Sequence, residues 1–123
     1  MYILGISAFY HDSAACLIKD GEIIVAAQEE RFSRIKHDKN FPKESIKFCI
    51  KYAKIKPANI DNVVFYEKPL LKFERIIETF LAYAPLGFKT FIKAIPVWIK
   101  EKLFQKFILI KELNALFSAN INW

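Results

Sequence analysis

The sequence predicts an α/β fold in which three strands, a helix and a fourth strand are followed by further helices. Three short apolar runs near the start have the composition of buried strands, and Asp20-Gly21 between the last two suits a type I′ hairpin turn. Apolar residues then recur with the 3.6-residue period of a helix, before a fourth β-branched run. The 123-residue chain is 54% hydrophobic, with 12 Phe, which indicates a folded core.

The first three strands are expected at residues 2–7 (YILGIS), 13–19 and 22–28. The second and third should be antiparallel neighbours, because a two-residue turn joins them. Their runs, AACLI and IIVAA, do not alternate cleanly between apolar and polar residues. Both faces of the sheet are therefore expected to be covered.

A polar segment at 29–41 (EERFSRIKHDKNF) should be a loop with room for a helical turn. Pro42 then suits the first turn of an amphipathic helix of about 12 residues. The fourth strand is expected at 62–66 (NVVFY). The apolar face of the helix would consist of Ile46, Cys49, Ile50 and Ala53.

The second half of the chain is predicted to be helical. One helix should cover 70–84 and end near Pro85. Two more are expected at 88–95 and 97–113, with a break at Pro96 because proline cannot donate a helical hydrogen bond.

Several classes of protein are not expected. Cys16 and Cys49 lie in apolar surroundings outside any CxxC pattern, which favours space-filling thiols in a reducing, cytoplasmic location. The start of the chain has no secretion signal, and the uncharged stretch 79–88 is too short for a membrane span and contains Pro85. The net charge of +6 is modest and no nucleic-acid motif is present, so no nucleic-acid partner is expected.

Three groups of residues are candidates for function. His11 and Asp12 lie between the first two strands, where loops commonly bind ligands, although the pair alone is more typical of a polar turn. The charged segment 29–38 could hold a phosphate or carbamoyl oxyanion, or it could be a solvated charge run. The basic, aromatic-rich segment 89–111 could bind an anionic membrane or a partner, or it could cover the sheet.

Taken in order, HDSAA, the Asp-Gly turn, EERxSRxKHD, VVFYEKP and FKTFIKAIPVWIKEKL resemble the amino-terminal portion of the O-carbamoyltransferase family. This family includes nodulation-type and antibiotic-tailoring carbamoyltransferases, and the resemblance covers nearly the whole chain. It implies part of a lobe of the actin, sugar-kinase and Hsp70 type. The expected divisions are a βββαβ core, a helical insertion and an irregular end, at 1–68, 69–113 and 114–123.

The resemblance also implies an activity. Family members use carbamoyl phosphate and ATP to make a carbamoyl-adenylate, and then transfer the carbamoyl group to a hydroxyl of a small acceptor. The family's HD pair corresponds to His11 and Asp12, which would be the catalytic residues of the acceptor site. His11 would act as a general base or orient the substrate, and Asp12 would orient His11 or bind the acceptor hydroxyl. The substrate-binding residues implied by EERxSRxKHD are Arg31, Arg34, Lys36, His37 and Asp38.

Family members continue with a further strand, a metal-binding HHxSHAA motif and the domain that activates carbamoyl phosphate. That motif is not in this sequence, whose histidines are His11 and His37, so no metal site is expected in the chain. The chain is therefore expected to be an amino-terminal fragment that is inactive without the carboxy-terminal part. The alternatives are a non-catalytic binding module for a ligand or partner, and a basic amphipathic protein of membrane surfaces.

Overall fold

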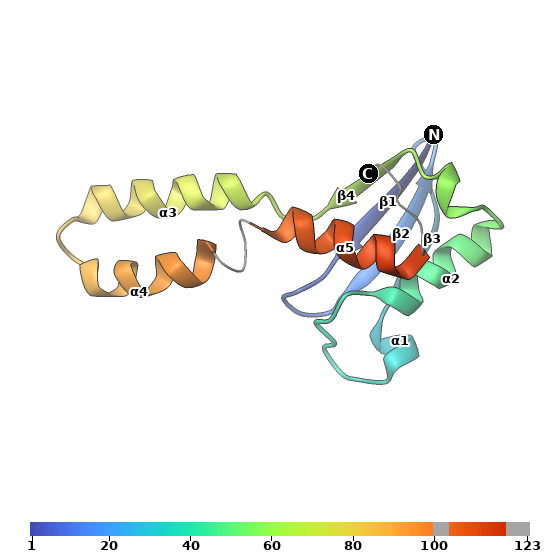
Figure 1. The fold of residues 1–123 in the computed structure, drawn as a ribbon, viewed down its shortest axis with the longest axis horizontal. Coiled ribbons are helices and arrows are strands. Elements are labelled where there is room, and N and C mark those ends of the chain that lie inside the picture. The colour runs from blue at the N-terminus through green and yellow to red at the C-terminus, as the bar shows by residue number, and fades with distance from the viewer. Residues whose placement is uncertain (100–103, 118–123) are drawn as a thin grey trace. The chain divides into compact units, whose positions relative to one another are not determined.

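The computed structural model describes residues 1–99 and 104–117, apart from the side chains at 69, 70, 94, 97 and 98 (Figure 1). Contacts within the chain divide it into two compact units. The core unit consists of Met1–Tyr66 and residues 112–117, and the helical unit consists of the described residues between 67 and 111. Each unit is described by itself below.

The core unit contains a four-stranded sheet, which confirms the mixed α/β fold. The strand order is β3-β2-β1-β4. β2 pairs antiparallel with β1 and with β3, and β1 pairs parallel with β4. Asp20 and Gly21 have φ angles of 51° and 93°, so the turn between β2 and β3 has the two positive φ angles that were predicted. The strands are β1 (Tyr2–Ser7), β2 (Ala14–Lys19), β3 (Glu22–Gln28) and β4 (Asn62–Phe65).

The predicted amphipathic helix is α2 (Lys43–Ala53), which follows Pro42 and packs against β2 and β3. Ile46, Cys49 and Ile50 are buried, and the Cys49 thiol lies 3.7 Å from the carbonyl oxygen of Ala15. The period read from the sequence therefore identified the face that contacts the sheet. Two shorter elements flank α2: the single turn α1 (Glu30–Ser33), inside the predicted polar loop, and the 3₁₀ turn η1 (Pro57–Asn59).

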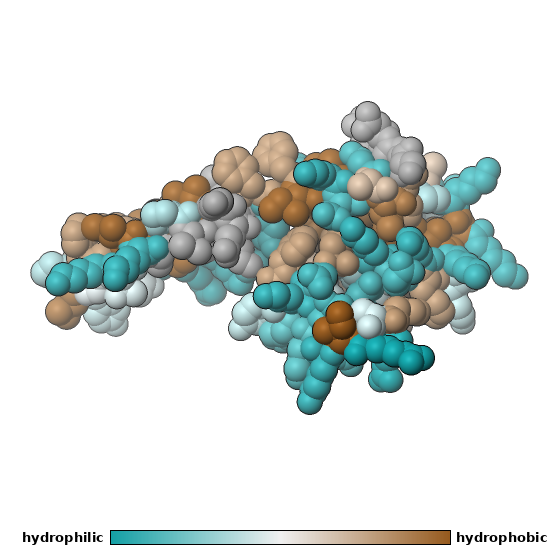
Figure 2. All heavy atoms as spheres, turned by 60° about the horizontal axis from the view of Figure 1, so that its bottom comes forward, coloured by the Kyte–Doolittle hydropathy of each residue, from teal (hydrophilic) through white to brown (hydrophobic). Residues whose placement is uncertain are grey.

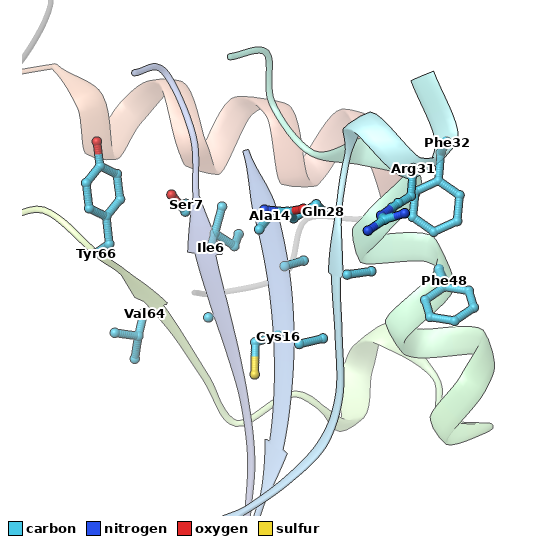
Figure 3. Close-up of a pocket in the computed structure, with 14 residues that line it drawn as sticks. Ile6, Ser7, Ala14, Cys16, Gln28, Arg31, Phe32, Phe48, Val64 and Tyr66 are labelled. Atoms are coloured by element: carbon cyan, nitrogen blue, oxygen red, sulfur yellow. The ribbon is translucent and has the colours of Figure 1, made fainter. Parts of the chain in front are cut away.

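The two faces of the sheet differ in burial. Leu4, Ile6, Ala15 and Leu17 point toward the α2 side and are buried. On the opposite face Val64 is 52% exposed, and within the described core unit Phe32 of α1 and Phe48 of α2 border a hollow over this face (Figure 3). The expectation that both faces are covered is therefore met on one side only within the described core unit, because the single long helix between β3 and β4 can cover one side.

The helical unit begins with α3 (Pro69–Tyr83) and α4 (Phe88–Trp98). The rings of Phe80 and Phe91 stack with centroids 4.0 Å apart and join these two helices. The predicted break at Pro96 was wrong, since α4 continues through it. Proline removes one hydrogen bond and crowds the preceding turn, but helical bonding resumes after it, since the N–H of Ile99 bonds to the carbonyls of Ile95 and Pro96.

The last described helix is α5 (Gln105–Phe117), which extends beyond the predicted end at residue 113. Within the core unit, Glu112 pairs with Lys43 at the start of α2 at 3.1 Å, and Leu113 is buried. Residues 100–103 of the predicted helix and 118–123 of the predicted irregular end lie outside the described residues. None of the described helices combines the length and apolar character needed to cross a membrane.

Candidate functional site

Two loops of the core unit meet at the end of the sheet where β1 and β3 finish. Loop A (residues 8–13) connects β1 to β2, and loop B (residues 29–41) follows β3. Backbone hydrogen bonds of 2.8 Å join them, with the N–H groups of Phe9 and Ser13 donating to the carbonyls of Lys39 and Asp38. The two stretches singled out in the sequence are thus held against each other by their main chains.

Asp12 bridges the two histidines of the chain. Its Oδ2 lies 2.8 Å from Nδ1 of His11 in loop A, and its Oδ1 lies 2.9 Å from Nδ1 of His37 in loop B. An ionised carboxylate only accepts hydrogen bonds, so each Nδ1 carries the hydrogen. In a neutral imidazole the other ring nitrogen, Nε2, is then an acceptor that can take a proton from a substrate.

The bridge also sets the charge of the site. Hydrogen bonds from His37, and then from His11, lower the pKa of Asp12. The hydrogen bond to Asp12 and its negative charge raise the pKa of His37, to which Glu30 contributes a smaller effect. The side chain of Asp12 is 35% exposed and that of His37 is 64% exposed, so both groups are accessible to a ligand.

Backbone conformation at this site is unusual. Asp12 and His37 have φ angles of 48° and 56°, and Phe9 and Arg34 in the same loops have 69° and 58°. Non-glycine residues rarely adopt this left-handed region, and such residues cluster at functional sites. The two residues joined by the bridge are therefore both held in conformations that an ordinary surface loop seldom needs.

The remaining residues of the predicted substrate-binding group separate into two kinds. Arg31, Arg34 and Lys36 are exposed, and within the described residues they form no ion pair. Asp38 is buried, and it accepts hydrogen bonds from the backbone and side chain of Asn40 at 3.0 and 2.8 Å, which lower its pKa. Asp38 thus shapes loop B, whereas the three cations are free to meet an anion.

Sequence reasoning missed the structural importance of Glu29. This residue is 5% exposed and follows the end of β3 directly. Its carboxyl group accepts hydrogen bonds from the backbone N–H groups of Glu44 and Ser45 at 3.0 and 2.8 Å, and from the Ser45 hydroxyl at 2.7 Å. The first N–H groups of a helix lack partners within the helix, so Glu29 fastens loop B to the start of α2. An acidic residue directly after a buried strand was the available signal.

No group of three His, Cys, Asp or Glu side chains in the described ranges is arranged to hold a metal ion. Figure 2 shows that hydrophilic residues gather over the part of the core unit around α1, where the loops reach the surface. The two loops therefore present a polar surface to a ligand.

The sequence matches the model of a known protein family. The model of the carbamoyltransferase N-terminus matches residues 2–120. An uncharacterized protein of Synechocystis sp. is 55% identical over 115 residues, which are 94% of this chain and 19% of that protein. Nodulation protein NolNO of Sinorhizobium fredii is 43% identical over 60 residues, which are 49% of this chain and 9% of that protein. The chain thus spans less than a fifth of the length of these relatives.

Proposed function

This chain belongs to the carbamoyltransferase family through that family's N-terminal region, and from this premise we propose that it supplies the acceptor side of an O-carbamoyltransferase. The reaction would move a carbamoyl group, obtained from carbamoyl phosphate with ATP through a carbamoyl-adenylate, to a hydroxyl of a small acceptor. Phosphate and pyrophosphate would leave as the adenylate forms, and AMP would leave as the hydroxyl attacks the carbamoyl carbon. The rest of the family polypeptide would supply the carbamoyl-activating site. The fragment alone would be inactive, and its sheet would form part of an actin-like lobe.

The observation that carries the proposal is the bridge from His11 through Asp12 to His37. A hydroxyl that attacks a carbamoyl carbon must lose its proton, and Nε2 of His11 can accept it while Asp12 stabilises the resulting imidazolium. His37, whose pKa is raised, keeps a positive charge to higher pH than an ordinary histidine and suits the oxygen atoms of the carbamoyl donor. Arg31, Arg34 and Lys36 would assist in holding an anion.

The test uses a joined protein, in which this chain replaces the matching 19% of the Synechocystis relative. With labelled carbamoyl phosphate and ATP, pyrophosphate release reports adenylate formation, and label in added methyl glycosides reports transfer to a hydroxyl. His11→Ala should reduce transfer roughly 100-fold, the scale of general-base catalysis, while pyrophosphate release stays within about twofold.

Asp20→Asn is the matched control, because Asp20 is an exposed acid in the turn between β2 and β3, outside both loops. It should leave both half-reactions unchanged. Equal loss of both half-reactions in His11→Ala would contradict the assignment of His11 to the acceptor side. Failure of the unmodified joined protein to carbamoylate any glycoside while it releases pyrophosphate would contradict a simple hydroxyl acceptor.

A further inference from the structure

The uncovered face of the sheet carries a row of small side chains. The strand register places Val64, Gly5, Cys16 and Ala26 side by side on β4, β1, β2 and β3. Successive residues of a strand point to opposite faces, so these four lie opposite the buried residues that face α2. The next row toward the loops on the same face consists of Ser7, Ala14 and Gln28.

These rows line a hollow of about 750 Å³ (Figure 3). Val64 and Tyr66 lie along one side of it in Figure 3, and Arg31, Phe32 and Phe48 lie along the other. The rings of Phe32 and Phe48 are 5.4 Å apart and form a wall next to the flat, small-residue floor. An apolar floor between two larger walls is a surface on which another apolar element can lie.

Gly5 indicates how closely that element approaches. A Cβ atom added at Gly5 would meet Cys16 alone, at 3.7 and 3.9 Å, which are ordinary contact distances. The described structure therefore has room for alanine, and the φ angle of Gly5 is not in the left-handed region. Glycine weakens a strand and is typical of places where another backbone comes near. The contacts of the described residues therefore do not by themselves require glycine at this position.

We propose that this face binds an apolar helix from the part of the family polypeptide that lies outside the segment matched by this chain. The relative that is 55% identical over 94% of this chain has four-fifths of its length outside the matched segment. The strand runs AACLI and IIVAA are typical of a sheet covered on both faces, and helices are the usual cover. The proposal rests on family membership, and it shares Arg31 with the anion-holding group proposed above but uses none of the bridging residues His11, Asp12 and His37.

Cys16 is a built-in reporter for this interface. It lines the hollow and is partly exposed, whereas Cys49 in α2 is fully buried on the other side of the sheet. N-ethylmaleimide labelling of each cysteine can be followed by mass spectrometry in the 123-residue chain and in the joined protein. Cys16 should be labelled at least about tenfold more slowly in the joined protein. Cys49 should be labelled slowly in both proteins, and its slow labelling is the control for intact folding.

A pair of matched variants tests the location. Ala26→Arg places a long cation on the exposed floor of the hollow, and Ala58→Arg places the same side chain on the exposed turn η1. In the joined protein, Ala26→Arg should restore Cys16 labelling to the rate of the chain alone, and Ala58→Arg should leave Cys16 protected. Circular dichroism of both variants in the chain alone should show the unmodified melting curve.

Three outcomes would overturn the proposal. One is equal labelling of Cys16 in the chain alone and in the joined protein. Another is protection that persists in Ala26→Arg. The third is protection of Cys16 in the chain alone that rises with its concentration together with a dimer mass in light scattering, because the face would then bind a second copy. Since labelling does not depend on turnover, it distinguishes this proposal from the acceptor site proposed above.

Discussion

Glu29 and Asp12 are two acidic side chains in adjoining loops, and both accept several hydrogen bonds, yet their environments are opposite. Glu29 is 5% exposed and its donors belong to the first turn of α2. Asp12 has a 35% exposed side chain and its donors are two imidazole rings at the surface of the loops. The comparison shows that burial and the kind of donor, more than the carboxyl group itself, separate a structural residue from one suited to chemistry.

The largest effect on stability is expected for Glu29→Ala. The substitution leaves the Ser45 hydroxyl and two N–H groups at the start of α2 without their acceptor, and should lower the free energy of unfolding by about 2–4 kcal/mol. Urea unfolding of the 123-residue chain measures the loss. Glu22→Ala, at an exposed position at the start of β3, should change it by less than about 0.5 kcal/mol. Equal losses in the two variants would remove the distinction between the buried and the exposed acid.

A smaller effect is expected for Ser45→Ala, because it removes one of the three hydrogen bonds to Glu29 and leaves the two from the backbone. The loss should be about 1 kcal/mol. The double variant with Glu29→Ala should lose less than the sum of the two single losses, since both changes remove the same contact. Strict additivity in the urea experiment would show that the two side chains act independently.

The smallest effect on stability is expected at the exposed bridge, where the change appears as a pH dependence. The raised pKa of His37 stabilises the fold below the ordinary histidine value of 6.5, and this contribution disappears as the pH rises through the raised pKa. The lowered pKa of Asp12 stabilises the fold above the ordinary value of 3.8, and this contribution disappears as the pH falls through the lowered pKa. The bridge therefore contributes most between these two ordinary values.

NMR titration of the imidazole signals checks the bridge directly. Asp12→Asn removes the negative charge, so the pKa of His37 should fall toward its ordinary value while the urea midpoint near neutral pH hardly changes. Asp20→Asn, which removes an exposed acid paired with the N-terminal amino group, should leave the His37 titration unaltered. An unchanged His37 pKa in Asp12→Asn would show that the two loops do not share this contact in solution.

Much of the fold could be read from local patterns. The Asp20-Gly21 turn, the period of α2 and the β-branched run of β4 each depend on residues close together in the sequence, and each was predicted within about a residue or two. The prediction at Pro96 was wrong because the local cost of proline, a lost hydrogen bond and crowding of the preceding turn, did not end the helix, which also packs against α3 through the Phe80–Phe91 stack.

The elements of the core, the two motifs and the family resemblance could be read from residue types at short fixed spacings. The pairings of distant residues appear only in the folded chain: Asp12 meets His37 from 25 residues away, Glu29 is buried against α2, and one face of the sheet lies open within the described core unit. The physical reason is that strand register and loop packing join distant segments through backbone hydrogen bonds, and no local period encodes those pairings. The same register sets Gly5, Cys16 and Ala26 in one row, and so turns three separate small residues into a single surface.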